Sequence, residues 1–346
     1  MQKTRVFLRR MIIIAAALVP AAAFAGPASI IEFVDAAGVD TAVFSDPSAP
    51  CHPRLPAWEL SIVEGTYSRF AAKRANADCR EAFGKAVRDF TEEEKTVLTQ
   101  YVAHIDSAVA VEFPVLNHLP WCFVVISDTF DLGVPNVGRY VILTKGLLKE
   151  MQEWSERQSN MFFIGMEILI REKALLLQNN RRETFEKFYT EVWGFRKIPA
   201  LSIDRLMQDN GLFFSRIPPN EWVIKLSPRD KEYIMPALLL RDAGKRGGGT
   251  AQRVAITIDS TSKGFFPRKS KKSPIEYIDL RHISYYRKKF PLSEYDYHPA
   301  EISVDLLTKY VVMKYVSAHY GTAPRKISEY SQIDVLMKML WGVGAK

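Results

Sequence analysis

A single carboxylate lies inside a long apolar segment of the chain. Residues 161–170 read MFFIGMEILI, so Glu167 is the only charged residue among them. A carboxylate buried without a partner is costly, so we expect Glu167 to face a cation, with Arg139, Arg171 or a residue of another helix as candidates. A repurposed catalytic carboxylate is the alternative. A structural salt bridge, or exposure on one helix face, is the favoured interpretation because buried ionisable groups are often structural.

A second group of candidate residues lies toward the C-terminus. His298 and Glu301 are separated by three positions, and Asp305 follows four positions after Glu301. Imidazole and carboxylate groups are zinc ligands. Glu167, His298 and Glu301 could therefore rebuild a metal site, provided that ligand number and geometry are satisfied. Acidic residues four apart also occur on solvated helix faces, and this is the simpler interpretation of Glu301 and Asp305.

The chain contains three cysteines, Cys51, Cys79 and Cys122. Cys51 and Cys79 are flanked by polar sequence and could form a disulfide in an oxidising compartment, whereas Cys122 lies in an apolar, strand-like run. Three unrelated thiols are the alternative. No CxxC motif indicates a redox pair or a zinc knuckle.

The first 25 residues are expected to be a cleavable secretory signal peptide. The first ten positions hold four basic residues and no acid, and the apolar run that follows ends in Ala23-Phe24-Ala25. This run is shorter than the roughly 20 residues that cross a bilayer as a helix, and no later segment is long and uncharged enough to do so. We therefore expect a periplasmic or secreted protein without a transmembrane span after cleavage.

The basic residues of the leader account for half of the formal net charge of +8. Without them, 43 Lys and Arg face 39 Asp and Glu, a balance that does not indicate a nucleic-acid partner. Residues 263–272 (KGFFPRKSKK) carry five cations and no acid. We expect an exposed, mobile insertion there, which could make weak contact with an anionic envelope surface or could simply be a solvated loop.

Hydrophobic patterning predicts an α+β chain whose longer elements are helices. Thr91 and Glu94 form a capping-box signature before a helix that runs to Val109. Residues 121–127 and 139–144 are β-branched and aromatic runs separated by turn residues, which predicts a hairpin. Further helices are expected at 146–154, 160–177, 228–242, 299–320 and 327–341, with helical sequence continuing to about Gln208, a loop at 244–249 and a strand at 254–258.

The middle of the chain carries an ordered set of motifs. Residues 135–144 (PNVGRYVILT) are followed by Gly146-Leu147-Leu148, then by the helix that contains Glu167, and later by Glu301-x-x-x-Asp305. This order resembles the HExxH zinc metallopeptidase family that includes the CAAX prenyl protease and the periplasmic β-barrel-assembly-enhancing protease.

The resemblance implies a fold and a binding surface. The fold would be a mainly helical α+β metallopeptidase-like (gluzincin) domain, with a small β-hairpin or sheet beside the active-site helix. In that family the hairpin edge binds the extended substrate, which implies Asn136, Gly138, Tyr140 and Ile142 as substrate-binding residues. Glu167 would correspond to the catalytic glutamate.

The chain departs from the family at both zinc-binding histidines. Met166 and Ile170 stand where those histidines belong, and neither side chain can replace imidazole in a site that activates water. Glu167 would then be a remnant, and no metal or other cofactor is expected. Zinc is expected only for the alternative, a site rebuilt from Glu167, His298 and Glu301.

These observations predict a domain organisation and a function. We expect a signal peptide at 1–25, an N-terminal helical region at 26–90, and a metallopeptidase-like domain at 91–346 with an insertion around 243–290. The expected function is a non-catalytic peptide-binding or regulatory module of the cell envelope, whose partner is an extended peptide or an envelope protein. An active metallohydrolase with a rebuilt site and a structural envelope protein are the alternatives.

Overall fold

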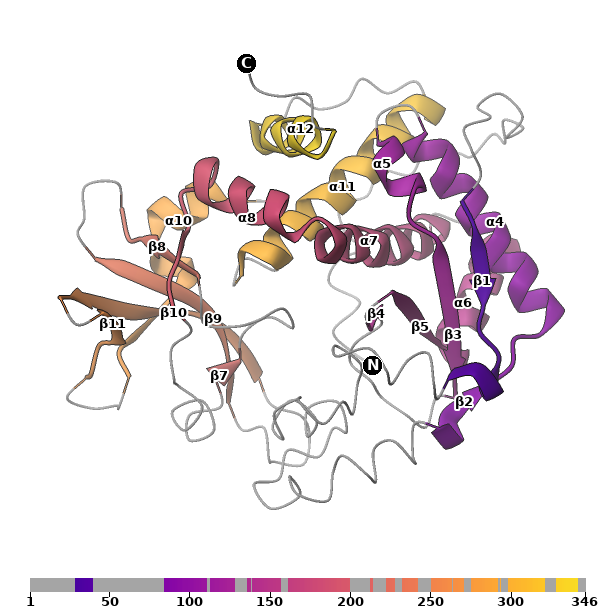
Figure 1. The fold of residues 1–346 in the computed structure, drawn as a ribbon, viewed down its shortest axis with the longest axis horizontal. Helices are drawn as coiled ribbons and strands as arrows, with labels where there is room; N and C mark the ends of the chain where they lie inside the picture. The colour runs from indigo at the N-terminus through magenta and orange to yellow at the C-terminus, as the bar shows by residue number, and fades with distance from the viewer. Residues whose placement is uncertain are drawn as a thin grey trace.

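A computed structural model describes most of the chain after residue 83. The described residues are 29–39, 84–110, 113–127, 136–137, 139–156, 161–199, 212–213, 222–227, 232–241, 250–262, 264–270, 275–291, 293, 298–320 and 328–341. The predicted signal peptide, Cys51, Cys79 and Gly138 lie outside them. The described part is an α+β structure with two sheets joined by a group of long helices (Figure 1).

The first sheet has five short strands in the order β1-β3-β5-β4, with β2 also paired to β3. Strands β1, β3 and β5 run parallel, whereas β4 is antiparallel to β5. The predicted hairpin between 121–127 and 139–144 is therefore wrong, because these runs are parallel neighbours and the hairpin is β4–β5. Every residue of β3 is buried, as is typical of a parallel strand covered on both faces. The strands are β1 (Ile31–Phe33), β2 (Val87–Arg88), β3 (Trp121–Ile126), β4 (Asn136–Val137) and β5 (Tyr140–Thr144).

Three helices pack beside this sheet: α4 (Glu92–Val109), α5 (Pro114–Asn117) and α6 (Lys145–Glu156). The predicted capping box at the start of α4 is confirmed. The Thr91 hydroxyl accepts from the Glu94 N–H at 3.2 Å, and the Glu94 carboxylate accepts from the Thr91 N–H at 3.0 Å. Helix α6 begins directly after β5, so the sheet and the helices are joined by a very short connection.

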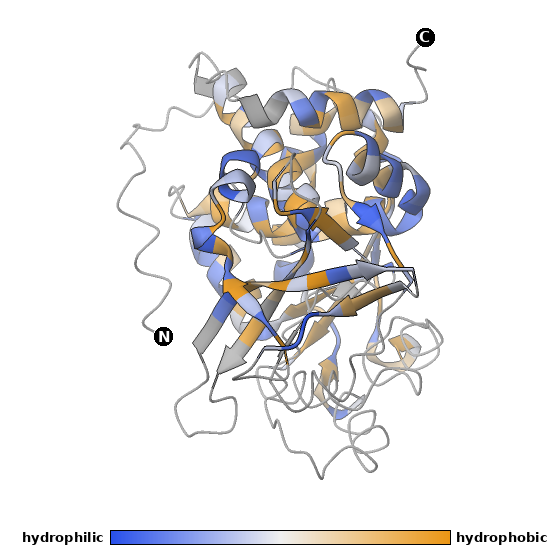
Figure 2. Cartoon of the chain, turned by 90° about the vertical axis from the view of Figure 1, so that its left-hand side faces the viewer, coloured by the Kyte–Doolittle hydropathy of each residue, from blue (hydrophilic) through white to orange (hydrophobic). Residues whose placement is uncertain are grey.

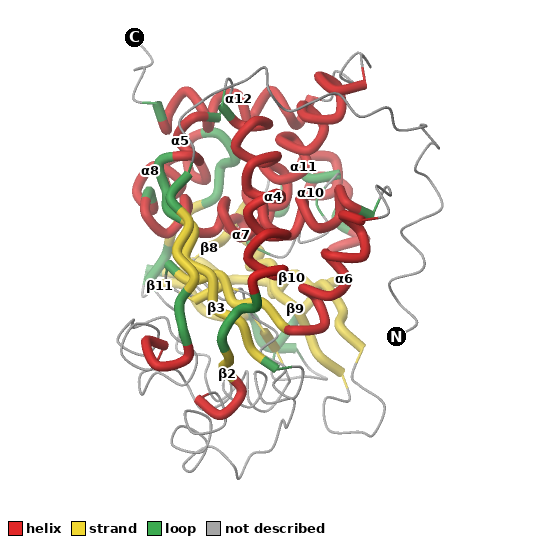
Figure 3. Tube along the Cα trace, turned by 90° about the vertical axis from the view of Figure 1, so that its right-hand side faces the viewer, coloured by secondary structure: helices red, strands yellow, loops and turns green. Residues whose placement is uncertain are grey.

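Four further helices form the centre of the molecule: α7 (Phe162–Asn180), α8 (Arg182–Glu191), α11 (Pro299–Tyr320) and α12 (Ser328–Leu340). Helix α7 is buried along most of its length, as its apolar sequence predicts. Helix α11 packs along α7, although the two are separated by more than a hundred residues (Figure 1). Most helices lie above the strands in Figure 3. None of the described helices is long and apolar enough to cross a bilayer.

The second sheet has seven antiparallel strands in the order β11-β10-β9-β8-β6, with β12 paired to β10 and β7 paired to β9. Hydrophobic and hydrophilic residues mix along these strands (Figure 2). A short 3-10 helix, η4 (Leu280–His282), and helix α10 (Ser284–Lys289) follow the last strand. The strands are β6 (Arg196–Lys197), β7 (Leu212–Phe213), β8 (Trp222–Lys225), β9 (Tyr233–Arg241), β10 (Thr250–Thr261), β11 (Gly264–Pro267) and β12 (Tyr277–Asp279).

The second sheet corrects several expectations. The helix predicted at 228–242 is wrong, because β9 covers most of that range and pairs with β10 along nine residues. Its Leu and Ala residues favour a helix locally, but the long strand partner decides the conformation. Part of the segment 263–272 is strand β11. The strands of the expected insertion at 243–290 continue a sheet that begins at β6, and the expected helical region at 26–90 contributes β1 and β2 to the first sheet.

Candidate functional site

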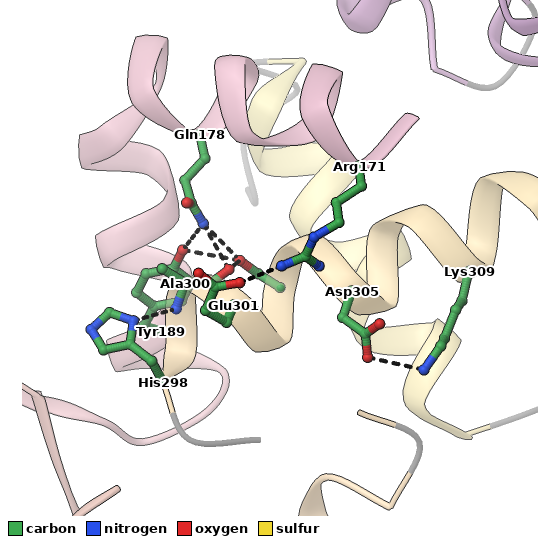
Figure 4. A network of polar contacts seen from close by, with 9 residues as sticks. Arg171, Gln178, Tyr189, His298, Ala300, Glu301, Asp305 and Lys309 are labelled. Carbon is green, nitrogen blue, oxygen red and sulfur yellow. Dashed lines mark hydrogen bonds and ion pairs between the residues drawn. The ribbon is translucent and has the colours of Figure 1, made fainter. Parts of the chain in front are cut away.

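The interface between α7 and α11 holds the charged residues that the sequence singles out (Figure 4). The Arg171 guanidinium forms a short ion pair with the Glu301 carboxylate. Glu301 is 4% exposed at its side chain and Arg171 is 19% exposed. One turn further along α11, Asp305 accepts from Lys309 at 3.0 Å. Both acids of the Glu301-x-x-x-Asp305 motif therefore contact cations.

Glu167 is positioned one turn before Arg171 on α7. It is half-buried, in contrast to Met166 and Ile170, which are fully buried in the main core. Partial exposure reduces the cost of keeping its carboxylate charged. Of the two cations proposed as its partners, Arg139 lies 3.9 Å from Glu32 and Arg171 pairs with Glu301.

A hydrogen-bonded group joins the C-terminal end of α7 to the start of α11 (Figure 4). The Gln178 amide nitrogen lies 2.6 Å from the Tyr189 hydroxyl, 2.9 Å from the Ser303 hydroxyl and 3.0 Å from the Ala300 carbonyl oxygen. The Tyr189 and Ser303 hydroxyls are 3.0 Å apart. Burial raises the pKa of Tyr189 far above its usual range, so its hydroxyl stays protonated. No motif predicted this group, because its members are ordinary polar residues on three different helices.

His298 caps the start of α11. Its Nδ1 accepts from the Ala300 N–H at 3.1 Å, which satisfies one of the free donors at the helix end. Burial lowers the pKa of His298 to about 3, so the ring is neutral. The proton is then on Nε2, which is buried and has no hydrogen-bond partner among the described residues. Neither ring nitrogen therefore presents a free lone pair to a metal.

The structure does not bring Glu167, His298 and Glu301 together as a metal site. No group of three potential His, Cys, Asp or Glu ligands occurs among the described residues, which include all three. The reason is that Glu167 and His298 lie near different levels of α7. His298 adjoins Ala300, which contacts Gln178, and Gln178 lies eleven residues or roughly 16 Å along the helix axis from Glu167. The rebuilt site is therefore not formed by these residues.

The hairpin edge presents backbone groups. Tyr140 and Ile142, two of the expected substrate-binding residues, are each 3% exposed. Asn136 pairs with Val141 in the hairpin, and Gly138 is outside the described residues. The side chains of Tyr140 and Ile142 thus face the interior, so a peptide could meet this strand only through its backbone.

One side of β5 is partly open. Strand β4 pairs with Tyr140 and Val141 only, and within the described chain no strand covers Ile142–Thr144 on that side. Strand β4 also contacts α7, so the open edge lies near the helix that carries Glu167. A strand side without a described partner strand is the place where an additional strand could pair, although Ile142 and Leu143 are buried.

A buried lysine is a further feature of α7. Lys173 is 1% exposed, donates to the Leu119 carbonyl oxygen and lies 4.2 Å from the centre of the Trp121 ring. Burial lowers its pKa to about 7, although the charges of Asp106 and Cys122 oppose this shift. No pattern in the sequence marks Lys173 as buried, and only its contacts with Leu119 and with Trp121 of β3 reveal the burial.

Cys122 is a buried free thiol on β3. Its sulfur donates to the Glu32 carboxylate at 3.1 Å. Burial is the main cause that raises the pKa of Cys122 to about 12, and the neighbouring Glu32 carboxylate adds to the shift. The raised pKa disfavours the reactive thiolate. Its predicted place in an apolar strand is confirmed.

A groove of about 560 Å³ separates the exposed sides of α4 and α6. It contains none of the residues discussed above. Its lining is mainly acidic and amide side chains, Glu92, Glu93, Thr96, Val97, Gln100, Gln152, Ser155 and Glu156.

Comparisons with known proteins add no relative. No protein-family model matches the chain, and no curated protein or solved structure matches it significantly. The chain has an α+β architecture in which ion pairs and hydrogen bonds join α7 to α11. The first sheet lies beside these helices, and its strand β5 has a partly open edge.

Proposed function

We propose that this protein is exported and binds extended peptides without hydrolysing them, as a degenerate relative of the HExxH metallopeptidases. The observation that carries the proposal is the Arg171–Glu301 ion pair. In the resemblance, Glu301 would be the third zinc ligand, and here its carboxylate binds a guanidinium. Met166 and Ile170, at the positions of the two histidines, are apolar core residues. Hydrolysis through a zinc-bound water would lack its ligands.

The proposed binding surface is the open edge of β5 at Ile142–Thr144. An extended peptide would add a strand there through main-chain hydrogen bonds, which require no particular side chain on β5. The peptide would continue the direction set by the two-residue strand β4 and lie near α7. Such a peptide would not need the side chains of Tyr140 and Ile142, which are buried.

The first test is the metal content and peptidase activity of residues 26–346, purified without chelator or added metal. We expect far less than one zinc or other transition metal per chain, and no cleavage of unstructured peptides. About one metal per chain together with cleavage that is lost in Glu167→Gln would show an active metallohydrolase instead.

The second test measures binding directly by hydrogen–deuterium exchange. Saturation with an unstructured peptide should slow the exchange of Ile142–Thr144 further, since the amides that point away from β3 would become hydrogen-bonded to the peptide. Strand β11 (Gly264–Pro267) on the other sheet is the internal control and should not change. A peptide of the same sequence with alternate backbone nitrogens methylated should bind more weakly. Unchanged exchange in β5 at saturating peptide would contradict strand addition, and the absence of any peptide binding would favour a structural envelope protein.

A further inference from the structure

A short helix at one end of the molecule presents only basic charge to solvent. Helix α10 and the preceding η4 expose Arg281, His282, Arg287 and Lys288, and Lys289 is half-buried beside them. No acidic residue occurs between Asp279 and Phe290. The basic surface predicted from the sequence is at 263–272 instead.

The described ion pairs neutralise Arg268 and Arg281 but not the cations of α10 itself. Arg268 is neutralised by Glu232 at 2.9 Å and by Asp259 at 2.7 Å. In η4, Arg281 pairs with Asp279 at 2.6 Å. Among the described residues, Arg287, Lys288 and Lys289 have no carboxylate partner, and the only polar contact of Arg287 is a 3.4 Å hydrogen bond to the Arg281 carbonyl oxygen.

The opposite face of α10 fixes these cations in place. Phe290, which follows the helix, packs against Trp193 with ring centres 5.3 Å apart and against Phe195 at 5.8 Å. Tyr286 is buried beside Phe290. Gly194 leaves room for Lys289, whose Nζ is 3.7 Å from the position that a Cβ at residue 194 would take. The basic face is therefore held on a rigid, aromatic base.

We propose that the basic face of α10, formed by Arg287, Lys288 and Lys289, binds the surface of an anionic phospholipid bilayer. Arg287 and Lys288 are exposed on the helix surface and Lys289 is half-buried beside them, so the geometry suits an extended anionic surface better than a small anion enclosed in a pocket. The large exposed apolar side chains of the described chain, Ile30, Phe266, Val335 and Trp341, are not on α10. Binding would therefore be peripheral, electrostatic and sensitive to salt.

The experiment measures the binding of residues 26–346 to vesicles by co-sedimentation. Vesicles of phosphatidylcholine with about one third phosphatidylglycerol are compared with phosphatidylcholine alone, at low and high NaCl. Each cation near an anionic bilayer contributes about fivefold to binding, so R287Q/K288Q/K289Q should weaken binding about a hundredfold. The matched control K145Q/K149Q/K338Q removes the same charge from exposed positions on α6 and α12 and should leave binding within about twofold.

The outcomes separate this proposal from others. If the two triple variants lost equal amounts of vesicle binding, the attraction would be due to net charge alone and the proposal would be overturned. Equal binding to neutral and anionic vesicles, or no binding to anionic vesicles, would also overturn it. Binding to double-stranded DNA or to soluble polyphosphate, without binding to vesicles, would assign the face to a different polyanion. The proposal goes beyond peptide binding at β5, because R287Q/K288Q/K289Q should retain the exchange protection of Ile142–Thr144.

Discussion

The Arg171 guanidinium on α7 and the Glu301 carboxylate in the first turn of α11 form an ion pair that is largely removed from solvent. It connects two helices that are distant in sequence, at the position where the resemblance would require a metal ligand. A partly buried pair of this kind is more important for keeping the helices in register than an exposed one.

Removing Arg171 should destabilise the protein. In Arg171→Met the buried Glu301 carboxylate loses its guanidinium, and we expect the free energy of unfolding to fall by about 3 kcal/mol. The double variant R171M/E301L should recover much of this loss, since neither charge then needs compensation. Urea denaturation of the two single variants and the double variant provides the measurement. Strictly additive losses would show that the two side chains do not stabilise each other.

Lys173 should make stability depend on pH near neutrality. Its folded-state pKa is lowered to about 7 from 10.5, so the unfolded chain binds more protons between these values and stability rises with pH across that window. The slope attributable to Lys173 should approach roughly 1.4 kcal/mol per pH unit above pH 7. Unfolding of the wild type and Lys173→Met between pH 6 and 8.5 tests this, because the variant should lack this rise. Parallel profiles would mean that Lys173 is charged in the folded state throughout.

Cys122 should react slowly with thiol reagents while the protein is folded. Its thiol is buried and its pKa is raised to about 12, so little thiolate is available. Titration with a disulfide reagent in guanidinium without reductant should detect one thiol per chain if Cys51 and Cys79 are paired as the sequence suggests. Three thiols would show that the predicted disulfide does not form.

Gly165 should tolerate no larger residue. A Cβ at this position would lie 2.7 to 2.8 Å from the ring and hydroxyl of Tyr101, which is fully buried between α7 and α6 and donates to the Met151 carbonyl oxygen. We expect Gly165→Ala to cost about 2 kcal/mol through overpacking. Gly84→Ala is the matched control, because no atom lies within 4 Å of its added methyl group. A thermal melt that places both variants near the wild type would contradict the close approach of α7 and Tyr101.

Local signals in the sequence predicted the elements that depend on local chemistry. Thr91 and Glu94 marked the start of α4 because a capping box involves residues only three apart. The apolar run that contains Met166 and Ile170 predicted a core helix, and the structure has α7 there. The long helix at 299–320 was predicted with the same limits as α11.

Features set by distant residues were not predictable in the same way. The direction of β3 relative to β5 depends on how the connection between them folds, and neither strand reveals it. Residues 228–242 were expected to form a helix because their Leu and Ala residues favour one locally. The pairing of β9 with β10, which decides the conformation, exists only in the folded sheet. In the candidate site, the simpler interpretation of Glu301, an acid on a solvated helix face, is wrong, because the sequence could not show that Arg171 reaches it across the α7–α11 interface, where it is buried.

The N-terminal strand has a consequence for the order of folding. Strand β1 pairs with β3, and the Glu32–Cys122 contact between them spans 90 residues of chain, whereas β3 and β5 are near neighbours in sequence. Ser29 is held in place by the Asp106 carboxylate, which accepts from its N–H and its hydroxyl at 2.7 Å each. Closing so long a loop costs entropy before any contact compensates for it. The residues that are synthesised early are therefore expected to join the first sheet late, and the part of the β3 edge at Trp121–Phe123 then has no partner strand until they arrive.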